Sequence, residues 1–395
     1  MQGNDSAERT NITARIDQIF DEVVEWRRFM HRNPELGFQE HKTTKWIIDK
    51  LEKWGYHIHR PCETGCVAVL EGEQPGSRVI ALRADIDALP IQEEGEAKAS
   101  FISENPGVAH CCGHDLHTTN LLGTARLLSE RKSDIAGKVV LIFQAGEEVL
   151  PGGGRILAET GILDDLKVQQ IFGLHTYPFL EPGKIATREG PMMASPFEFR
   201  LELSGKGGHA AAPHQAVDPI VIAAQVLMQI QTIVSRNIDP SDAAVVTVGK
   251  IQAGTAPNII PEKAFMEGTI RTFSEEQTYE IFDRITAIAE NTATGMGGSA
   301  KSELITGYPP VINDPEATQK LRDAAGEDLV MLHKPVMAGE DFSFYQKHIP
   351  GAFFFLGSGS EEADSCYSWH HPKYNVDERS LKTGMQVMTQ LVLSP

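Results

Sequence analysis

The 395-residue chain has few cysteines and a deficit of positive charge. Five cysteines, an odd number, argue against a disulfide framework and leave thiols available to bind a metal. Cys62 and Cys66 have no second close pair, which argues against a structural zinc ribbon. Lysine and arginine total 36 against 54 acidic residues, and the resulting net charge of −18 repels phosphate backbones and anionic lipid. We therefore expect no nucleic-acid partner.

Long hydrophobic runs are also missing. The first residues, MQGNDSAERTNITARID, lack the apolar core of a signal peptide, and the run Ile220–Met228 is too short to cross a bilayer. We therefore expect a soluble, cytoplasmic protein with no membrane contact. The length of the chain and its 41% apolar content indicate two globular domains.

The order of strand-like and helical segments differs between two parts of the chain. Strand-like runs such as Val79–Leu82 and Val139–Phe143 alternate with helical segments up to residue 190, which is typical of an α/β domain. Residues 191–306 instead read strand, helix, strand, strand, helix, strand, a split βαβ pattern. Residues 307–395 return to the α/β pattern of the first part. We therefore expect one domain built from 1–190 and 307–395, with 191–306 inserted as a second domain.

Polar side chains follow three of the apolar runs of the first domain. Asp85 and Asp87 follow VIALR, Glu147 and Glu148 follow VVLIFQ, and His175 follows IFGL. The carboxyl ends of parallel strands meet at one edge of a sheet, so these side chains should converge there. Taken singly, His175 could be an ordinary strand-end histidine, and the two aspartates could cap the next segment.

The stretch HCCGHDLH, residues 110–117, holds three imidazoles, two thiols and a carboxylate. Cysteine, histidine and glutamate together suit a borderline transition metal such as zinc or manganese better than calcium. Adjacent carboxylates are costly to bring together unless a cation or a proton neutralises them. The sequence therefore predicts a hydrolytic metal site. The glycine runs at 152–154 and 205–208 do not form a phosphate-binding loop and are expected to be tight turns.

The chain resembles a known family through an ordered series of motifs. From HRNPELGFQE onward these are LRADIDALPI, HCCGHDLHTTNLLG, FQAGEE, GLHTYP, SGKGGHAAAPHQAVDP, GTAPNIIP, GTIRTF, AGEDFSFY and HHPKY. The sequence resembles the aminoacylase, hippurate hydrolase and indole-acetyl-amino acid hydrolase family of dinuclear metallopeptidases, in its amidohydrolase branch.

The resemblance implies an α/β fold in two parts. The catalytic domain would have a central mixed sheet flanked by helices, and the insertion would be a split-βαβ (ferredoxin-like) lid and dimerisation domain. It also implies two divalent metal ions per subunit, with manganese, zinc, nickel or cobalt as the candidates, and a homodimer formed through the lid.

Matched motif by motif, the resemblance also implies roles for individual residues. The first histidine of the HHP motif would be a ligand, which selects His370 over His371. Glu147 would be the general base that takes a proton from a metal-polarised water. The metal ligands would be Cys112, which bridges the two ions as a thiolate, together with His114, Glu148, His175 and His370.

Residues of the expected lid have implied roles as well. His209 would help to polarise the scissile carbonyl, although it could also be a surface-loop histidine. Asn258 and Arg271 would contact the substrate, although Arg271 could instead pair with a nearby acid. Asp87 and Glu340 would orient metal ligands.

Three positions depart from the family pattern. Cys111 stands where a small residue is more common, Ala145-Gly146 replaces Pro-Ala, and Leu116 stands where glycine is frequent. None of the three changes removes a ligand.

The implied activity is hydrolysis of the amide bond of an N-acyl amino acid, a small-molecule substrate. A dipeptidase or aminopeptidase on the same scaffold is the alternative within the enzymes. A non-catalytic binding protein with this fold is the alternative outside them, and the presence of Glu147 beside a complete ligand set argues against it.

Overall fold

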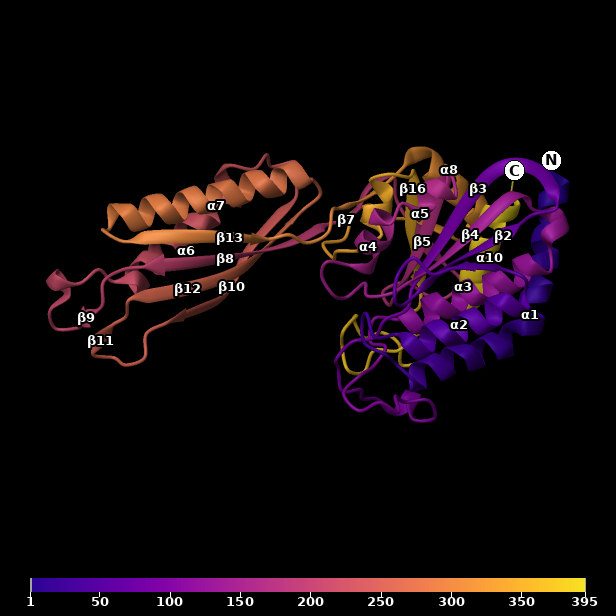
Figure 1. Ribbon diagram of the computed structural model, residues 1–395, viewed down its shortest axis with the longest axis horizontal. Coiled ribbons are helices and arrows are strands. Elements are labelled where there is room, and N and C mark those ends of the chain that lie inside the picture. The colour runs from indigo at the N-terminus through magenta and orange to yellow at the C-terminus, as the bar shows by residue number, and fades with distance from the viewer. Residues whose placement is uncertain (1, 395) are drawn as a thin grey trace. The chain divides into compact units, whose positions relative to one another are not determined.

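The computed structural model describes residues 2–394, which form two compact units (Figure 1). Unit 1 runs to Met192 and also includes Ile312–Lys334 and the chain from Asp341 onward. Unit 2 comprises Met193–Val311 and Pro335–Glu340. The return of residues 335–340 to unit 2 was not foreseen from the sequence.

Unit 1 is built around an eight-stranded mixed sheet in the order β1-β2-β4-β3-β5-β16-β6-β15. The neighbours β4, β3, β5 and β16 are parallel, whereas β2 runs antiparallel to β4, and β6 antiparallel to β16. The predicted central mixed sheet flanked by helices is confirmed. The strands are β1 (His57–His59), β2 (Cys66–Glu71), β3 (Gln74–Asp85), β4 (Ala136–Gln144), β5 (Gln170–Tyr177), β6 (Ile185–Thr187), β15 (Leu329–Met331) and β16 (Gly351–Gly357).

Helices cover this sheet, and for that reason its central strands are apolar along nearly their whole length. All seven residues of β16 are buried, as are the last seven residues of β3. Helix α3 packs on β3, β4 and β5, and α1 packs on both α3 and α10. The helices are α1 (Gln2–Arg32), α2 (His41–Lys53), α3 (His114–Ser129), α4 (Gly153–Glu159), α5 (Ile162–Asp165), α8 (Pro315–Ala325), α9 (Ser343–Gln346) and α10 (Ser380–Leu393).

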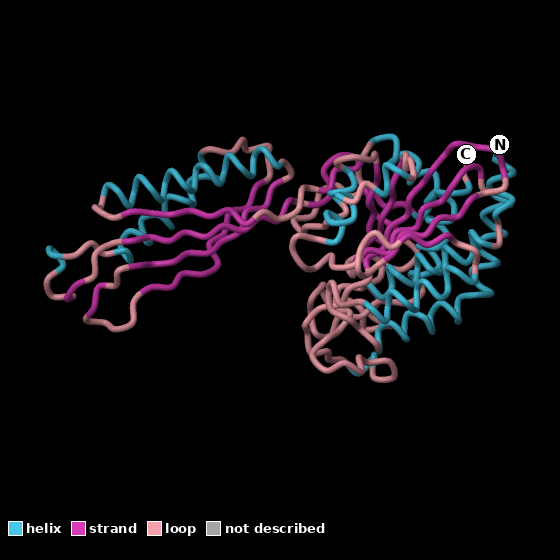
Figure 2. Tube along the Cα trace, in the orientation of Figure 1, coloured by secondary structure: helices cyan, strands magenta, loops and turns pink. Residues whose placement is uncertain are grey.

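Because of the strand register, the polar residues at the ends of β3, β4 and β5 lie side by side at one edge of the sheet. Asp85, the last residue of β3, pairs with Gln144 at the end of β4. On the other side of β3, Arg83 pairs with Gly173 of β5, and continuing this register brings Asp85 level with His175. Two loop-rich segments follow, one between β3 and α3 and one between β16 and α10, and they lie together in Figures 1 and 2. Backbone hydrogen bonds join them, such as that from Glu94 N to Pro372 O, 3.0 Å.

Unit 2 has a four-stranded antiparallel sheet in the order β10-β12-β8-β13. Strand β8 alternates buried and more exposed residues, because one face packs on two helices and the other does not. The elements are β8 (Ser195–Ser204), β9 (Gly208–His209), α6 (Pro219–Arg236), β10 (Ala244–Ala253), β11 (Ile259–Ile260), β12 (Lys263–Thr272), α7 (Glu275–Gly295) and β13 (Ser299–Ile305). Two further short strands, β7 (Gly190–Met193) and β14 (Val311–Asn313), pair with each other.

Helix α6 is longer and more apolar than the run Ile220–Met228 suggested. Its 18 residues have a mean hydropathy of 1.2, so by length and composition alone it could cross a membrane. One face, including Val226 and Ile230, is nevertheless buried in the core of unit 2. Core helices of soluble proteins pass the same test, so the expected absence of membrane contact stays a prediction.

Candidate metal centre

The five predicted ligands lie together at the carboxyl edge of the large sheet. Cys112 Sγ lies 3.3 Å from His175 Nε2, and His370 Nε2 lies 3.1 Å from Glu148 Oε1. His114 Nε2 is 3.9 Å from the same Glu148 oxygen. Two of the close groups of potential ligand atoms consist entirely of predicted ligands, namely Cys112 with His114 and His175, and Cys112 with Glu148 and His370. Cys112 belongs to both, the position that a ligand bridging two ions would occupy.

The polar atoms of this cluster suit divalent cations. His114 Nε2 is buried without a hydrogen-bond partner, an arrangement that costs free energy unless something else binds it. Burial alone would lower the pKa of His114, but Asp85, Asp87 and Glu148 raise it to about 10. The local field therefore favours a positive charge at this position. A thiol, imidazoles and a carboxylate are the donor set of a borderline transition metal.

Neighbouring groups fix the orientation of two of the histidines. Asp87 lies 3.1 Å from His114 Nδ1 through one carboxylate oxygen, and its other oxygen accepts the Glu148 N–H at 3.0 Å. His175 Nδ1 lies 2.8 Å from the Thr176 carbonyl. In both rings Nδ1 is engaged, which leaves Nε2 to face the cluster, as in metal-binding histidines. Asp87 thus stands where it can orient both His114 and Glu148, the role expected from the sequence.

Local backbone conformation places the ligands that come from loops. Gly113 has φ 95° before α3, and a Cβ there would approach Thr176 Oγ1 to 2.5 Å, so glycine is required between Cys112 and His114. His370 has φ 64°, a conformation that is costly for a residue with a Cβ. Its N–H is held by the Cys111 carbonyl at 2.8 Å.

The two adjacent cysteines lie in different surroundings. Cys111 is buried, and burial raises the pKa of its thiol to about 12. Within the described residues it joins none of the potential ligand groups, whereas Cys112 joins two. The thiol of Cys111 is therefore protonated at neutral pH and lies outside the ligand groups. His371, the unselected histidine, turns its Nδ1 toward the N–H of Lys373, 3.0 Å away.

Glu147, the expected base, is buried and forms a further close group with His114 and Glu148. The residue before it is clamped, since Gly146 N–H donates to Glu40 Oε1 at 2.8 Å. Gly146 has φ 59°, and a Cβ there would lie 2.5 Å from the Phe38 ring. The loop that carries both glutamates is therefore held from behind by Phe38 and Glu40.

Sequence reasoning missed a pair of buried groups beneath the cluster. His117 Nε2 accepts the Thr176 N–H at 2.8 Å, so its Nδ1–H donates to Asp85, 2.6 Å away. With both nitrogens used, His117 supports the site and does not face it. Arg83 bridges Asp85 and Asp341 at 2.8 Å each, fully buried. The spacing of His117 one helical turn after His114 was the available signal.

A second buried network was also missed. Asp115 lies 2.7 Å from Arg27 and 2.8 Å from His31 of α1, and His31 Nε2 lies 2.5 Å from Glu93. Lys98 pairs with Glu93 at 2.6 Å and donates to the Tyr374 carbonyl, also 2.6 Å. These charges tie α1 and the start of α3 to the segment that follows His370.

The remaining predicted residues belong to unit 2. His209 is exposed on β9, where its Nδ1 accepts the Ala211 N–H at 3.0 Å. The Asn258 carbonyl accepts the Ala210 N–H at 3.1 Å. Arg271 is partly buried on β12 and donates to Thr269 Oγ1 at 2.5 Å. Glu340 is buried at the end of the 335–340 segment.

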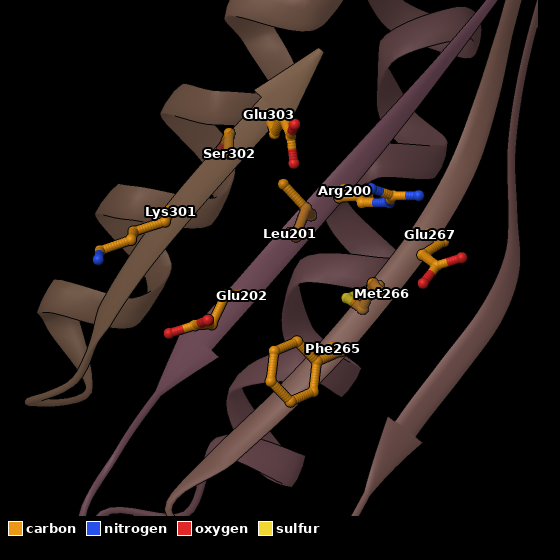
Figure 3. Close-up of a pocket in the computed structure, with 9 residues that line it drawn as sticks. All are labelled: Arg200, Leu201, Glu202, Phe265, Met266, Glu267, Lys301, Ser302 and Glu303. Atoms are coloured by element: carbon orange, nitrogen blue, oxygen red, sulfur yellow. The ribbon is translucent and has the colours of Figure 1, made fainter. Parts of the chain in front are cut away.

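A hollow of about 360 Å³ lies on the helix-free face of the unit 2 sheet (Figure 3). Its side chains come from β8, β12 and β13, and charges of both signs alternate there, as with Arg200, Glu202 and Lys301. None of its lining residues is a histidine or a cysteine, and none is a predicted site residue. It is therefore not the metal centre.

Known proteins resemble this chain over most of its length. Residues 81–394 match the model of peptidase family M20/M25/M40. The N-acetylcysteine deacetylase of Bacillus subtilis is 40% identical over 379 residues, 94% of this chain and 96% of that protein. The N-acyl-L-amino acid amidohydrolase of Geobacillus stearothermophilus is 44% identical over 299 residues, 75% of this chain and 80% of that protein.

A solved structure agrees with these relatives. A Bacillus subtilis dinuclear metal-binding peptidase of the M20 family superposes with a TM-score of 0.82 at 36% identity, covering 95% of this chain and 98% of that one. The predicted family resemblance is thereby confirmed. The ligand groups that share Cys112 agree with a dinuclear centre. The chain belongs to peptidase family M20/M25/M40, and its chemistry is metal-dependent amide hydrolysis.

Proposed function

We propose that this protein hydrolyses the amide bond of N-acyl amino acids and releases a carboxylic acid and a free amino acid. The observation that carries the proposal is the buried donor cluster around Cys112, with Glu147 beside Glu148 at its edge. Relatives at 40% and 44% identity are named for the same reaction on N-acetylcysteine and on N-acyl-L-amino acids.

Each residue of the cluster has a distinct task in this reaction. Bound divalent ions, held by Cys112, His114, Glu148, His175 and His370, would polarise the substrate carbonyl and lower the pKa of a water molecule. Glu147 accepts the proton of that water and later delivers it to the departing amine. Asp87 keeps Nε2 of His114 directed at the cluster through its contact with Nδ1. Glu340 is assigned a similar orienting role.

Substrate recognition is assigned to unit 2. An N-acyl amino acid carries a carboxylate next to the scissile nitrogen, and a protein of net charge −18 needs a local cation to bind it. Arg271 provides a planar guanidinium suited to bidentate binding, and Asn258 adds a neutral donor. His209 would polarise the scissile carbonyl. We further propose that unit 2 acts as a lid and as the dimer surface, so that His209 serves the site of the other subunit.

A hydrolysis panel tests the proposal. N-acetyl, N-benzoyl and indole-acetyl amino acids are assayed beside dipeptides, with metal content measured on the same protein. We expect cleavage of N-acyl amino acids, loss of activity on exhaustive chelation, and recovery to different extents with manganese, zinc, cobalt or nickel. Cleavage of dipeptides alone would assign the site to a dipeptidase, and full activity without metal would overturn the proposal.

A further inference from the structure

Unit 1 contains a cavity of about 250 Å³ behind the loop that carries Glu147. Its walls come from residues 61–66, from Phe143–Ala145 at the end of β4, and from Gly153, Ile156 and Leu157 of α4, with Phe38 completing the lining. We call it the Phe38 cavity. None of the proposed metal ligands lines it, so it is distinct from the metal centre.

The walls of the Phe38 cavity are mainly apolar and contain no cationic side chain. Phe38, Ile156 and Leu157 are among the apolar lining residues, and the lining includes no lysine, arginine or histidine; its single acidic residue, Glu63, is exposed. Burial raises the pKa of the Cys62 thiol, and it raises that of Cys66 to about 12, so both thiols are neutral at pH 7. The lining therefore suits an uncharged, apolar occupant.

The volume limits the size of such an occupant. An apolar cavity of about 150 Å³ holds one benzene molecule. The Phe38 cavity is larger than this and below the usual range of pockets for drug-sized ligands, which begins near 300 Å³. A molecule with one aromatic ring, or two fused rings, fits these limits.

Phe38 connects the cavity to the catalytic loop. It has φ 62°, a costly conformation for a bulky residue, and its ring covers the Cα of Gly146. Gly146 directly precedes Glu147 and is held on the same side by Glu40. An occupant that shifts the Phe38 ring therefore shifts Gly146, and Glu147 with it.

We propose that the Phe38 cavity binds a small neutral aromatic molecule and that its occupancy alters turnover through the contact between Phe38 and Gly146. Binding itself is independent of the proposed function, whereas the effect on turnover rests on it. A ligand changes the position of this loop only to the extent that it binds one loop position more tightly than another.

Fluorobenzene is the probe, observed by ¹⁹F NMR with the full chain. We expect saturable binding to the wild type. Cys62→Trp places an indole from the half-buried rim into the cavity and should abolish that binding. Met331→Trp is the matched control, because it adds the same indole on β15, at the opposite end of the sheet from β1 and β2. Ile156→Trp serves as a second filling variant if Cys62→Trp melts at a lower temperature than the control.

The coupling between the Phe38 cavity and the loop that carries Glu147 is measured in two ways. Fluorobenzene should change hydrogen exchange at the amides of Gly146 to Val149, a measurement that needs no substrate. It should also change kcat by at least about fivefold, the lower end of ordinary allosteric effects. Absence of saturable binding, or undiminished binding to both filled variants, would overturn the site. Binding that leaves both exchange and kcat unchanged would overturn the coupling. Altered exchange in a protein that cleaves no N-acyl amino acid would support the site and reject the proposed function.

Discussion

At the scale of single residues, two adjacent cysteines illustrate how position decides chemistry. Cys112 Sγ lies 3.3 Å from His175 Nε2, whereas Cys111 is buried outside the ligand groups. We expect Cys112→Ala to lose bound metal and Cys111→Ala to retain it. Metal content per subunit, measured by plasma mass spectrometry after gel filtration, checks this. The reverse pattern would move the bridging role to Cys111.

The adjacent residues Glu147 and Glu148 should also differ in their roles. Glu147→Gln removes the proton acceptor, preserves the shape of the side chain and leaves Glu148 in place. We expect turnover to fall by at least ~100-fold while metal content is unchanged, because general base catalysis is lost and binding is not. Single-turnover rates and metal content are measured on the same sample. An active variant would require a different base.

The sequence predicted where ligands lie better than it predicted what supports them. Asp85, Glu148 and His175 were placed together because each follows an apolar run, a pattern that strand geometry converts into proximity. The contacts of Asp115 with Arg27 and His31 bring together residues more than 80 positions apart, and no local periodicity reports them. Buried ion pairs of this kind depend on packing between α1 and α3, which one sequence does not encode as a pattern.

At the scale of elements, the segment around His370 is held in place from several sides. Trp369 Nε1 donates to the Thr176 carbonyl at 2.9 Å, and His370 N–H donates to Cys111. Lys98, at the end of a short 3₁₀ turn that begins at Glu96, donates to the Tyr374 carbonyl. These bonds offset the cost of the positive φ at His370.

Removing one of these bonds should loosen the ligand it positions. We expect Lys98→Met to weaken binding of one of two metal ions by about tenfold, the lower range for groups that orient ligands. Chelator competition measures the affinity. Lys98→Arg should restore part of it, since a guanidinium can still donate to a carbonyl. Equal weakening of both ions would point to a general loss of structure.

Glu93 makes the same network sensitive to acid. Burial raises the pKa of Glu93, but His31 and Lys98 outweigh it and lower the value to about 2. A depressed carboxyl pKa adds stability above its unfolded value of about 4.3, and this is lost as the pH falls toward 2. We expect the stability difference between wild type and Glu93→Gln to shrink below about pH 4.3. Urea unfolding at pH 3 to 7 measures it, and a constant difference would contradict the assignment.

At the scale of the whole molecule, the change in the order of expected helices and strands indicated an inserted domain. It did not indicate that Pro335–Glu340 clusters with unit 2. Six residues carry no periodicity, and their assignment depends on contacts such as the bridge between Met193 and Val336. That a substrate contacts residues of both units is part of the proposed function.

That proposal makes a prediction about substrate preference. N-acyl amino acids should be cleaved far better than the matching amino acid amides, because the proposal assigns binding of the carboxylate to Arg271. Arg271→Ala should erase most of this preference, and Arg271→Lys should recover only part, since one ammonium cannot reproduce the guanidinium fork. kcat/KM for each acid and amide pair checks it. An unchanged preference in Arg271→Ala would refute the role.

A mixing experiment addresses His209. If His209 serves the site of the other subunit, as proposed, chains carrying Glu147→Gln and chains carrying His209→Ala, each inactive alone, should regain activity when subunits exchange, because a mixed dimer would contain one complete site. Exchange is followed by native mass spectrometry of the two variants. Failure to regain activity despite demonstrated exchange would place His209 in its own subunit's site or outside catalysis.

The packing of α1 against α10 has a consequence for synthesis on the ribosome. Lys382 of α10 contacts Asp17 of α1, and Glu378, just before α10, pairs with Arg28 of α1, so the core of unit 1 cannot close until the α10 segment has been synthesised. Most of unit 2 is one continuous segment, Met193–Val311, which leaves the ribosome before α10 does. Its local contacts favour earlier folding, which leaves the first half of unit 1 as the nascent segment that needs protection from aggregation longest.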